Sequence, residues 1–222
     1  MLKSSPESYE HIWGGGYFLG GGGRVYSSFR NKPFPNGNID ESVVDTGAEL
    51  LVGMDFNVNP MSAIIAVRAA DECHIIDSIE VMTSNTEEMA QELKRRYPKR
   101  RIIVYPDPAG KQRHTNAPVG QTDFTILERA GFEVRAPNQA PLVVDRVNNA
   151  NEMFEYDERR RIRIHPRAKA LITALSNFIY KPDTSIPKKD GFDHLCDAMG
   201  YLLWSEFNVL QRNSLTVTTF RI

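Results

Sequence analysis

The sequence has few of the features that mark secreted, membrane-spanning or cysteine-ligated metal proteins. Among its 222 residues are two cysteines, Cys73 and Cys196, which lie far apart in apolar surroundings. There is no CxxC pair to indicate a zinc site, and a cytosolic disulfide would be unusual. No run of 18 or more apolar residues occurs, and the start, MLKSSPESYEHIW, lacks the apolar stretch of a secretory signal. We therefore expect a soluble protein that acts in the cytoplasm without a membrane partner.

A phosphate-binding loop is also missing. Such a loop requires GxxxxGK followed by Ser or Thr, and GKQRHT at 110–115 places Gln after Gly-Lys. Seven of the 15 glycines fall in GGGYFLGGGG, between Gly14 and Gly23, without forming that motif. A P-loop ATPase is therefore the least favoured function. We interpret residues 1–45 as a linker or arm, with short strand pieces around Tyr17 and Val25.

Positive charge is concentrated in two segments, although the formal net charge is only −1. KRRYPKRR at 94–101 has six basic residues in eight, and RRRIRIHPRAK at 159–169 has six in eleven. Such clusters suit a track of phosphate contacts, but they are equally typical of solvated helix ends and loops. The sequence leaves both interpretations open.

From residue 49 onward, the pattern alternates between strands and helices. The expected strands lie at about 49–57, 62–69, 73–82, 101–105, 132–136 and 161–165. The expected helices lie at about 86–97, 122–131, 141–156, 166–178 and 193–207. The first three strands form a meander, and helices separate the later ones, which should therefore run parallel to the first. This order predicts an α/β fold with a mixed five-stranded or slightly extended sheet and helices on both faces, resembling the ribonuclease-H-like fold.

Acidic side chains occupy three unusual positions in this pattern. Asp55 lies within the apolar strand LLVGMDF, Asp107 directly follows the strand at 101–105, and Asp193, His194 and Asp197 share one side of the last helix. There are simpler explanations for some of them. Asp193 stands where a helix N-cap belongs, Asp107 precedes turn residues, and Asp197 would suit a salt bridge. Asp55 has no such local explanation, because aspartate is disfavoured in a strand interior.

These positions are expected to meet in space. If the strands at 49–57 and 101–105 are neighbours, Asp55 and Asp107 converge, and the last helix places Asp193 and Asp197 against them. Clustered carboxylates repel one another unless protons or cations neutralise them, and hard oxygen ligands suit Mg²⁺ or Mn²⁺. Two such ions would assist an in-line phosphoryl displacement. We therefore expect a divalent-metal site with two ions.

Three segments, GMDFNVNPM, VYPDPAG and FDHLCDAMGYLLW, resemble the nuclease domain of the large terminase subunit of headful-packaging tailed bacteriophages, podophage type. The resemblance spans about 45–207, and HIWGGGY is similar to the segment that follows the motor domain in such proteins. It implies an endonuclease that cuts concatemeric viral DNA. It also implies an isolated nuclease domain at 46–207, following an absent ATPase domain, with a C-terminal tail at 208–222.

Carried over by motif, Asp55 and Asp107 match the first two metal-binding acids. The third is open between Asp193 and Asp197, with His194 as a further ligand. Glu80 and Asp77, on the third strand, are possible accessory groups only, and solvation at the edge of the strand is the favoured interpretation. The family also has a mobile hairpin before the last acid, which IYKPDTSIPKKDG at 179–191 would match. The residues expected to contact DNA are basic and lie near these motifs: Lys181, Lys188, Lys189, Lys111 and Arg113.

The resemblance implies double-stranded DNA, the ATPase domain, the small terminase subunit and the portal as partners, in the host-cell cytoplasm. Two other functions remain open. A junction resolvase or transposase-like nuclease would use the same fold, and a resolvase would be expected to form a dimer. A non-catalytic adaptor that docks onto the portal would show neither metal-dependent cleavage nor a change in melting temperature with Mn²⁺.

Overall fold

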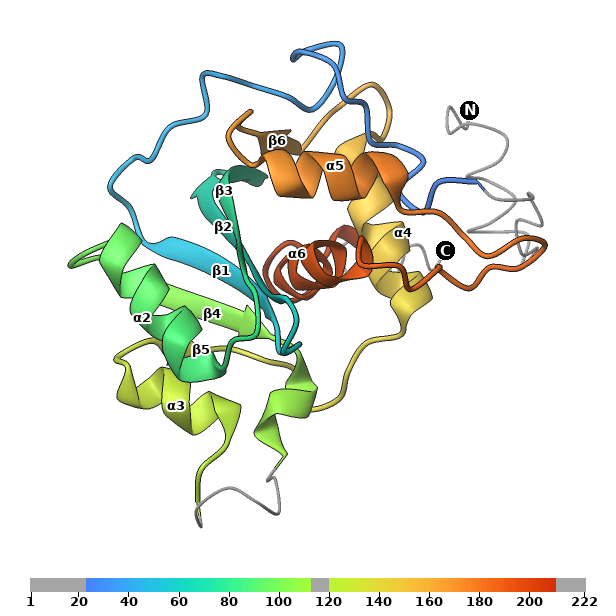
Figure 1. Cartoon of the computed structure of the whole chain (residues 1–222). Coiled ribbons are helices and arrows are strands. Elements are labelled where there is room, and N and C mark those ends of the chain that lie inside the picture. The colour runs from blue at the N-terminus through green and yellow to red at the C-terminus, as the bar shows by residue number, and fades with distance from the viewer. Residues whose placement is uncertain (1–22, 113–119, 211–222) are drawn as a thin grey trace, which may run out of the picture.

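A single six-stranded sheet organises the computed structural model, which describes residues 23–112 and 120–210 (Figure 1). Its strands, in the spatial order β5-β4-β1-β2-β3-β6, are Glu133–Val134, Ile102–Pro106, Leu50–Asp55, Met61–Ala69, Glu72–Val81 and Ile162–Ile164. β1, β2 and β3 form an antiparallel meander, while β4 pairs with β1, β5 with β4 and β6 with β3 in parallel. The predicted strand directions are therefore confirmed, and the sheet is the extended form of the expected five-stranded one.

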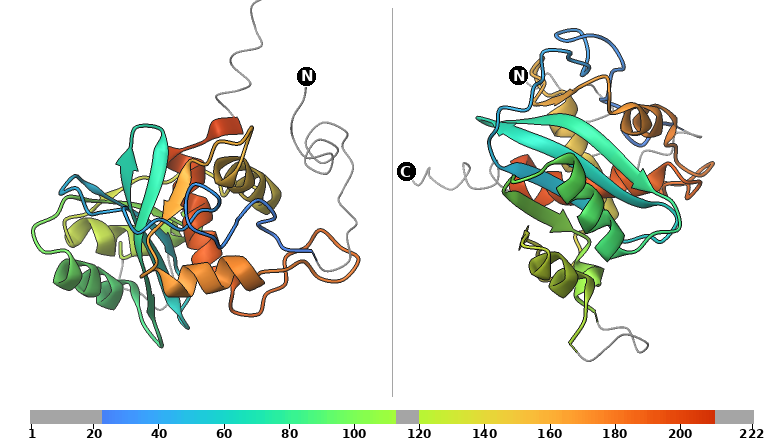
Figure 2. Two further views of the ribbon diagram at one scale, coloured as in Figure 1. Left: turned by 90° about the horizontal axis from the view of Figure 1, so that it is seen from above. Right: turned by 60° about the vertical axis from the view of Figure 1, so that its left-hand side comes forward.

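Helices cover both faces of the sheet (Figure 2). The helices are α2 (Thr86–Arg96), the short 3₁₀ helix η1 (Pro108–Lys111), α3 (Asp123–Arg129), α4 (Val143–Phe154), α5 (Lys169–Asn177) and α6 (Asp193–Glu206). One apolar core lies between the sheet and α2 and α3, and a second lies between the sheet and α4, α5 and α6. The sheet is therefore buried on both sides, as the apolar strands predict.

Local sequence signals explain where two of the helices begin. The side chain of Asn85 accepts a hydrogen bond from the Glu88 amide at the start of α2. Thr122 and Thr125 form a reciprocal capping box at the start of α3. Each side chain satisfies an amide that has no partner inside its helix, which stabilises the helix by about 1 kcal/mol.

A close approach between α6 and β1 sets the position of the site. A Cβ atom on Gly53 would lie only 2.1 Å from the carbonyl oxygen of Ala198. Glycine therefore allows α6 to pack directly on the strand that carries Asp55. None of the described helices is long and apolar enough to span a membrane.

Residues 23–45, the described part of the expected arm, pack against the core. Val25, Tyr26 and Phe29 are buried in the same cluster as α4, α5 and α6. Asn38 is fully buried, and Ile39 forms an isolated bridge with Ile164 of β6. This segment therefore contributes to the folded unit. The boundary between arm and nuclease domain stays a prediction, and residues 1–22, including Tyr17 and HIWGGGY, lie outside the described residues.

Candidate functional site

The carboxyl ends of β1 and β4 bring Asp55 and Asp107 together. In the parallel pairing, Met54 lies opposite Pro106, and the Asp107 amide donates to the Met54 carbonyl at 3.1 Å. Asp55 and Asp107 therefore occupy adjacent positions at one edge of the sheet, where open α/β sheets place their ligands. The Asp107 carboxylate also accepts from the Ala109 amide at 2.9 Å, so it caps η1 as the turn interpretation expected.

The first two turns of α6 add three further groups. His194 Nδ1 lies 3.1 Å from Asp55 Oδ2, and His194 Nε2 lies 2.9 Å from Asn57 Nδ2. Since a carboxylate accepts and an amide nitrogen donates, these partners favour the histidine tautomer with its proton on Nδ1. Asp193 is the first residue of α6, and its carboxylate accepts from the Gly191 amide at 3.2 Å. Asp193 therefore does not cap the helix by the usual bond to an amide within the first turn.

Asp197 and Asp193 have cationic partners from outside α6. Arg146 Nη1, from α4, lies 3.0 Å from Asp197 Oδ1. Lys189 Nζ lies 3.3 Å from Asp193 Oδ2, and only 5% of the Asp193 side chain is exposed. The salt bridge that the sequence allowed for Asp197 is therefore present. It engages one carboxylate oxygen, Oδ1, and leaves the other without a hydrogen bond to any side chain among the described residues.

The pKa values of Asp55 and Asp197 are both raised. Burial, followed by the charge of Asp197, raises the pKa of Asp55 to about 6, with a smaller contribution from Asp107 and an opposing one from His194. Burial also raises the pKa of Asp197, although the nearby Arg146 lowers it. The pKa of Asp55 thus depends on the charges of Asp197, on α6, and of Asp107, directly after β4. A buried carboxylate with a raised pKa gains most from a bound cation, because the cation favours its charged form.

The oxygen donors fit Mg²⁺ or Mn²⁺, but they are not yet gathered around one point. Among the described residues, no three His, Cys, Asp or Glu side chains converge tightly enough to enclose an ion. Three of the acids have partners instead: Asp197 pairs with Arg146, Asp193 with Lys189, and Asp55 with His194. To bind a cation together, these carboxylates would have to rotate toward it. The identity of the ligands stays a prediction.

Sequence reasoning missed two side chains at this site, Arg146 and Tyr201. Burial raises the Tyr201 pKa well above its usual range, and the charge of the nearby Asp107 raises it further. Both residues lie on apolar helix faces, where a tyrosine is ordinarily counted as core and an arginine as a surface residue. Of the two accessory acids, Asp77 accepts from Tyr97 at 2.9 Å, on the α2 side of the sheet. Ser62 of β2 lies opposite both Asp55 of β1 and Glu80 of β3, so Glu80 is two strands away from Asp55 in the same register.

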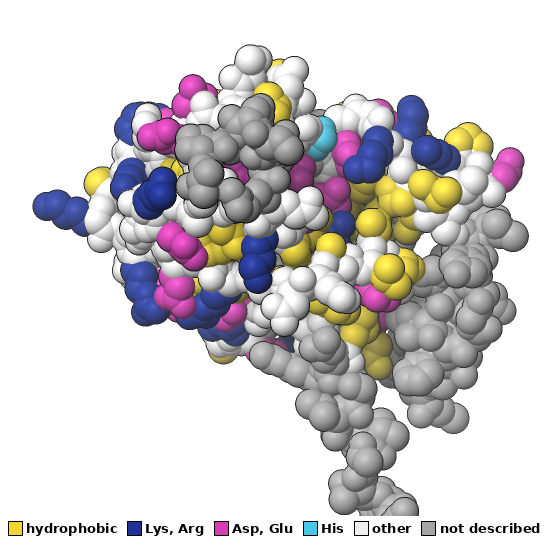
Figure 3. All heavy atoms as spheres, turned by 90° about the horizontal axis from the view of Figure 1, so that it is seen from below, with side chains coloured by type: hydrophobic (Ala, Val, Ile, Leu, Met, Phe, Trp, Pro, Cys, Tyr) yellow, Lys and Arg dark blue, Asp and Glu magenta, His cyan; other side chains and the backbone are white. Residues whose placement is uncertain are grey.

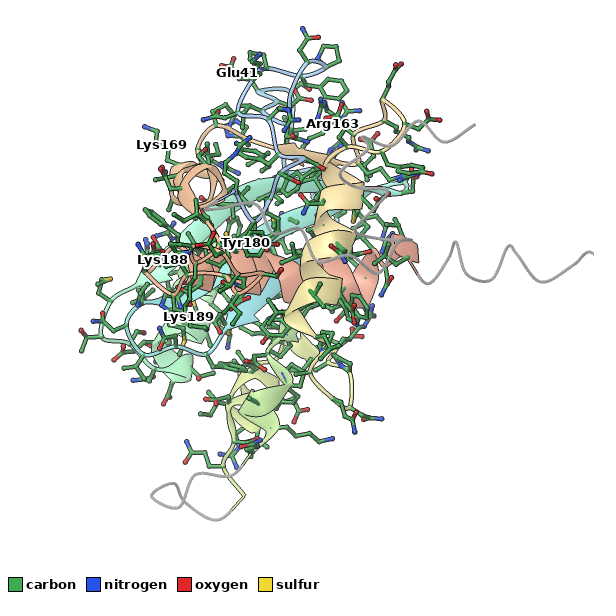
Figure 4. All side chains as sticks on the ribbon, turned by 90° about the vertical axis from the view of Figure 1, so that its right-hand side faces the viewer. Glu41, Arg163, Lys169, Tyr180, Lys188 and Lys189 are labelled. Atoms are coloured by element: carbon green, nitrogen blue, oxygen red, sulfur yellow. The ribbon has the colours of Figure 1, made fainter. Side chains whose placement is uncertain are left out.

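The segment at 179–191 forms a hairpin-like loop beside the acids. Tyr180 bridges Pro187, and the Lys188 amide donates to the Ile179 carbonyl at 2.9 Å. Figure 4 shows Tyr180, Lys188 and Lys189 together on this loop. The expected DNA-contacting residues Lys181, Lys188 and Lys189 are exposed, as is Lys111 at the end of η1. Arg113 lies outside the described residues.

A cavity of about 280 Å³ separates this loop from α4. Its wall is mostly apolar, and Asp193 and Asp197 are the two acids that line it. The lining residues are Val143, Val144, Val147, Phe178, Tyr180, Ser185, Ile186, Pro187, Lys189, Asp193 and Asp197. On the face drawn in Figure 3, a histidine and acidic side chains border a hydrophobic patch with basic side chains at its edge. The site is therefore acidic at its centre, with apolar and basic surroundings.

The two basic segments are largely neutralised by neighbouring acids. In the first, all four arginines form ion pairs: Arg95, Arg96, Arg100 and Arg101. In the second, four of the five arginines do so: Arg159, Arg160, Arg161 and Arg163. A paired guanidinium offers less charge to a phosphate. The geometry therefore favours the solvated-surface interpretation of these segments over a phosphate track.

Comparison with known proteins decides the family. Residues 52–206 match the family model of the terminase RNaseH-like domain. The chain belongs to this family. The match contains Asp55, Asp107 and Asp197, and it confirms the ribonuclease-H-like fold that the order of elements predicted. No curated protein matches the sequence.

Solved structures of phage terminases share the fold of this terminase domain. The large terminase of a thermophilic bacteriophage, in complex with ATP-gamma-S, has a TM-score of 0.66 at 15% identity. The match covers 86% of this chain and 47% of that one, so the chain spans about half the length of that terminase. The P22 large terminase nuclease domain has a TM-score of 0.60 at 13% identity, covering 86% of this chain and 94% of that one. At these identities the likeness shows a common fold.

Proposed function

We propose that this terminase domain is a divalent-metal-dependent DNA endonuclease that cuts concatemeric viral DNA during headful genome packaging. The observation that carries the proposal is the proximity of Asp55, at the end of β1, to Asp107, directly after β4, and to Asp197, on α6. The P22 relative is described as a nuclease domain, which agrees with this interpretation. The large terminase of the thermophilic phage was determined with a bound nucleotide analogue, which agrees with an ATPase domain preceding this one in the full protein.

Each side chain has a role in this proposal. Asp55, Asp107 and Asp197 supply oxygen ligands, with Asp193 and His194 beside them. Two bound Mg²⁺ or Mn²⁺ ions would supply an activated water and charge stabilisation at the departing 3′ oxygen. His194 orients Asp55 through its Nδ1 proton, and Asn57 fixes the ring from the other nitrogen. β1 holds Asp55 more rigidly than a loop would, and the bond of the Asp107 amide to Met54 fixes Asp107 beside it, which favours an aligned attack.

Nicking of supercoiled plasmid DNA tests the proposal. We expect cleavage with Mn²⁺ or Mg²⁺ and none with EDTA, together with a rise in melting temperature on addition of Mn²⁺. A protein that leaves DNA intact with every divalent cation, and whose melting temperature Mn²⁺ does not change, would instead be the non-catalytic adaptor. A dimer that cuts four-way junctions in preference to linear duplexes would favour the resolvase.

The exposed lysines beside the site are proposed to contact DNA phosphates. Lys188 pairs with Asp190 and Lys189 with Asp193, each at 3.3 Å, and we propose that both lysines exchange these carboxylates for phosphates when DNA binds. Lys188→Ala and Lys189→Ala are each expected to weaken duplex binding severalfold and to lower the slope of log affinity against log salt by about 1, because each removes one phosphate contact. Fluorescence anisotropy in Ca²⁺ at several salt concentrations measures both quantities. Lys94→Ala is the control, since Lys94 lies on α2 over the Phe132 ring, on the other face of the sheet. Equal slopes for all three variants and the wild type would contradict the assignment.

A further inference from the structure

Arg146 is a buried cation to which the proposed reaction assigns no role. It lies in α4, and only 5% of its side chain is exposed. Its Nη1 donates to Asp197 Oδ1 at 3.0 Å and to the Asp197 main-chain oxygen at 3.4 Å. Removing an arginine from water is costly unless its partner is fixed. The pair therefore holds Asp197 in one orientation.

The same guanidinium also packs on Tyr201, which lies near Asp107, the acid that follows β4. It lies over the Tyr201 ring, 4.2 Å from the ring centroid, and burial, followed by the charge of Asp107, raises the Tyr201 pKa. Gly200 provides the room, because a Cβ atom there would lie 3.2 Å from Arg146 Nη1. Arg146 thus contacts one candidate ligand, Asp197, directly, and it packs on a tyrosine that lies near a second, Asp107.

α4 itself is tied to α6, which makes Arg146 a fixed charge. Asn149 donates to the Leu203 carbonyl at 3.2 Å and accepts from the Val209 amide at 2.9 Å. These bonds lie one turn beyond Arg146 on the same helix. A lysine on a flexible loop, such as Lys189 with a side chain 76% exposed, can leave its carboxylate far more easily than Arg146 can.

We propose that Arg146 is a positioning residue of the nuclease site and a permanent counter-charge within it. It fixes one oxygen of Asp197 so that the other faces the incoming cation. Its positive charge also repels that cation and keeps divalent-metal binding weak. The inference rests on the proposed function, since it assigns Arg146 to the same metal site.

Loss of the Arg146 charge should raise the affinity for Mn²⁺ and lower the cleavage rate at saturating Mn²⁺. In Arg146→Met, Mn²⁺ is expected to bind about tenfold more tightly, because one nearby positive charge is gone. Cleavage at saturating Mn²⁺ is expected to fall at least about tenfold, because Asp197 is no longer held in place. Arg146→Lys keeps the charge, so its Mn²⁺ affinity should stay near wild type while its saturated rate recovers only in part. Isothermal titration calorimetry and single-turnover cleavage measure the two quantities separately.

Arg163→Met is the matched control. Arg163 is also ion-paired, to Asp40 at 3.2 Å and Glu72 at 2.9 Å, and it lies 3.9 Å from the Phe34 ring centroid. Figure 4 shows it well away from Lys188 and Lys189. Its loss should lower the melting temperature and leave both Mn²⁺ affinity and saturated rate unchanged.

Two results would overturn the inference alone: wild-type Mn²⁺ affinity and saturated rate in Arg146→Met, or weaker Mn²⁺ binding in that variant. Changes of the same size in Arg163→Met would also overturn it, since they would reveal a general effect of stability. If Arg146→Met does not fold, Arg146→Gln replaces it, with the same expected split. A wild-type protein that neither binds Mn²⁺ nor cuts DNA would overturn the proposed function and this inference together.

Discussion

Asp55→Asn is expected to reduce DNA cleavage about a thousandfold or more while making the metal-free protein more stable. The catalytic loss follows because the amide cannot replace the charged oxygen ligand that is central to the cluster. The gain in stability follows from the pKa of about 6, which lies above the 3.8 of an unperturbed aspartate. An acid with a raised folded-state pKa favours folding only while it is protonated, and this contribution is lost as the pH rises from about 4 through 6.

The size of the gain should therefore depend on pH. Above pH 7 the free energy of unfolding of Asp55→Asn should exceed that of the wild type by about 2 kcal/mol, and near pH 4 the two should be equal. Urea denaturation in EDTA at pH 4, 6 and 8 measures this difference. Asp77→Asn serves as the control, because Asp77 pairs with Tyr97 and Arg96 on the opposite face of the sheet. A variant that cuts DNA at the wild-type rate, or one destabilised at pH 8, would contradict the role given to Asp55.

Asn38→Ala is expected to lower the free energy of unfolding by about 3 kcal/mol, and the melting temperature by roughly 10 °C. The Asn38 side chain accepts from the Arg30 amide at 2.9 Å and donates to the carbonyls of Phe154 and Ile162, each at 3.1 Å. Alanine would remove the partner of the Arg30 amide and of the Ile162 carbonyl, while the Phe154 carbonyl would keep only its 3.3 Å bond from Arg160. The effect is large because the side chain joins residues 23–45 to both α4 and β6.

This result would measure how much the packing of residues 23–45 contributes to the stability of the domain. Asn36→Ala is the matched control, since Asn36 is exposed two residues earlier. Circular dichroism during thermal unfolding should show one cooperative transition that shifts down in Asn38→Ala and stays in place in Asn36→Ala. An unchanged transition in Asn38→Ala would mean that this segment is an arm that the domain does not need.

The arrangement of strands and helices was largely predictable, because it depends on local patterns. Alternating and continuous apolar runs placed each strand, and Asn85 and Thr122 marked two helix starts that the structure confirms. The position of Asp55 in an apolar strand also indicated a functional site without any contact information. The helix boundaries differ from the prediction by at most three residues, as expected where the terminal turns lack a strong capping signal.

The partners of charged side chains were not predictable, because they depend on contacts between distant segments. Arg146 is 51 residues from Asp197 in sequence, and no local pattern links them. Arg100 similarly forms an ion pair with Asp45, and Arg159 with Asp71, so much of the positive charge of the basic segments is neutralised. The glycine- and proline-rich composition before residue 45 indicated a linker or arm. Composition alone could not predict that Tyr26 and Phe29 pack against Phe154.

Anomalous X-ray scattering from crystals soaked in Mn²⁺ tests the central claim most directly. The account predicts a manganese peak bound by carboxylate oxygens of Asp55, Asp107 and Asp197, with Arg146 still on Asp197. A peak bound elsewhere, or a soaked crystal with no manganese between β1, β4 and α6, would contradict it.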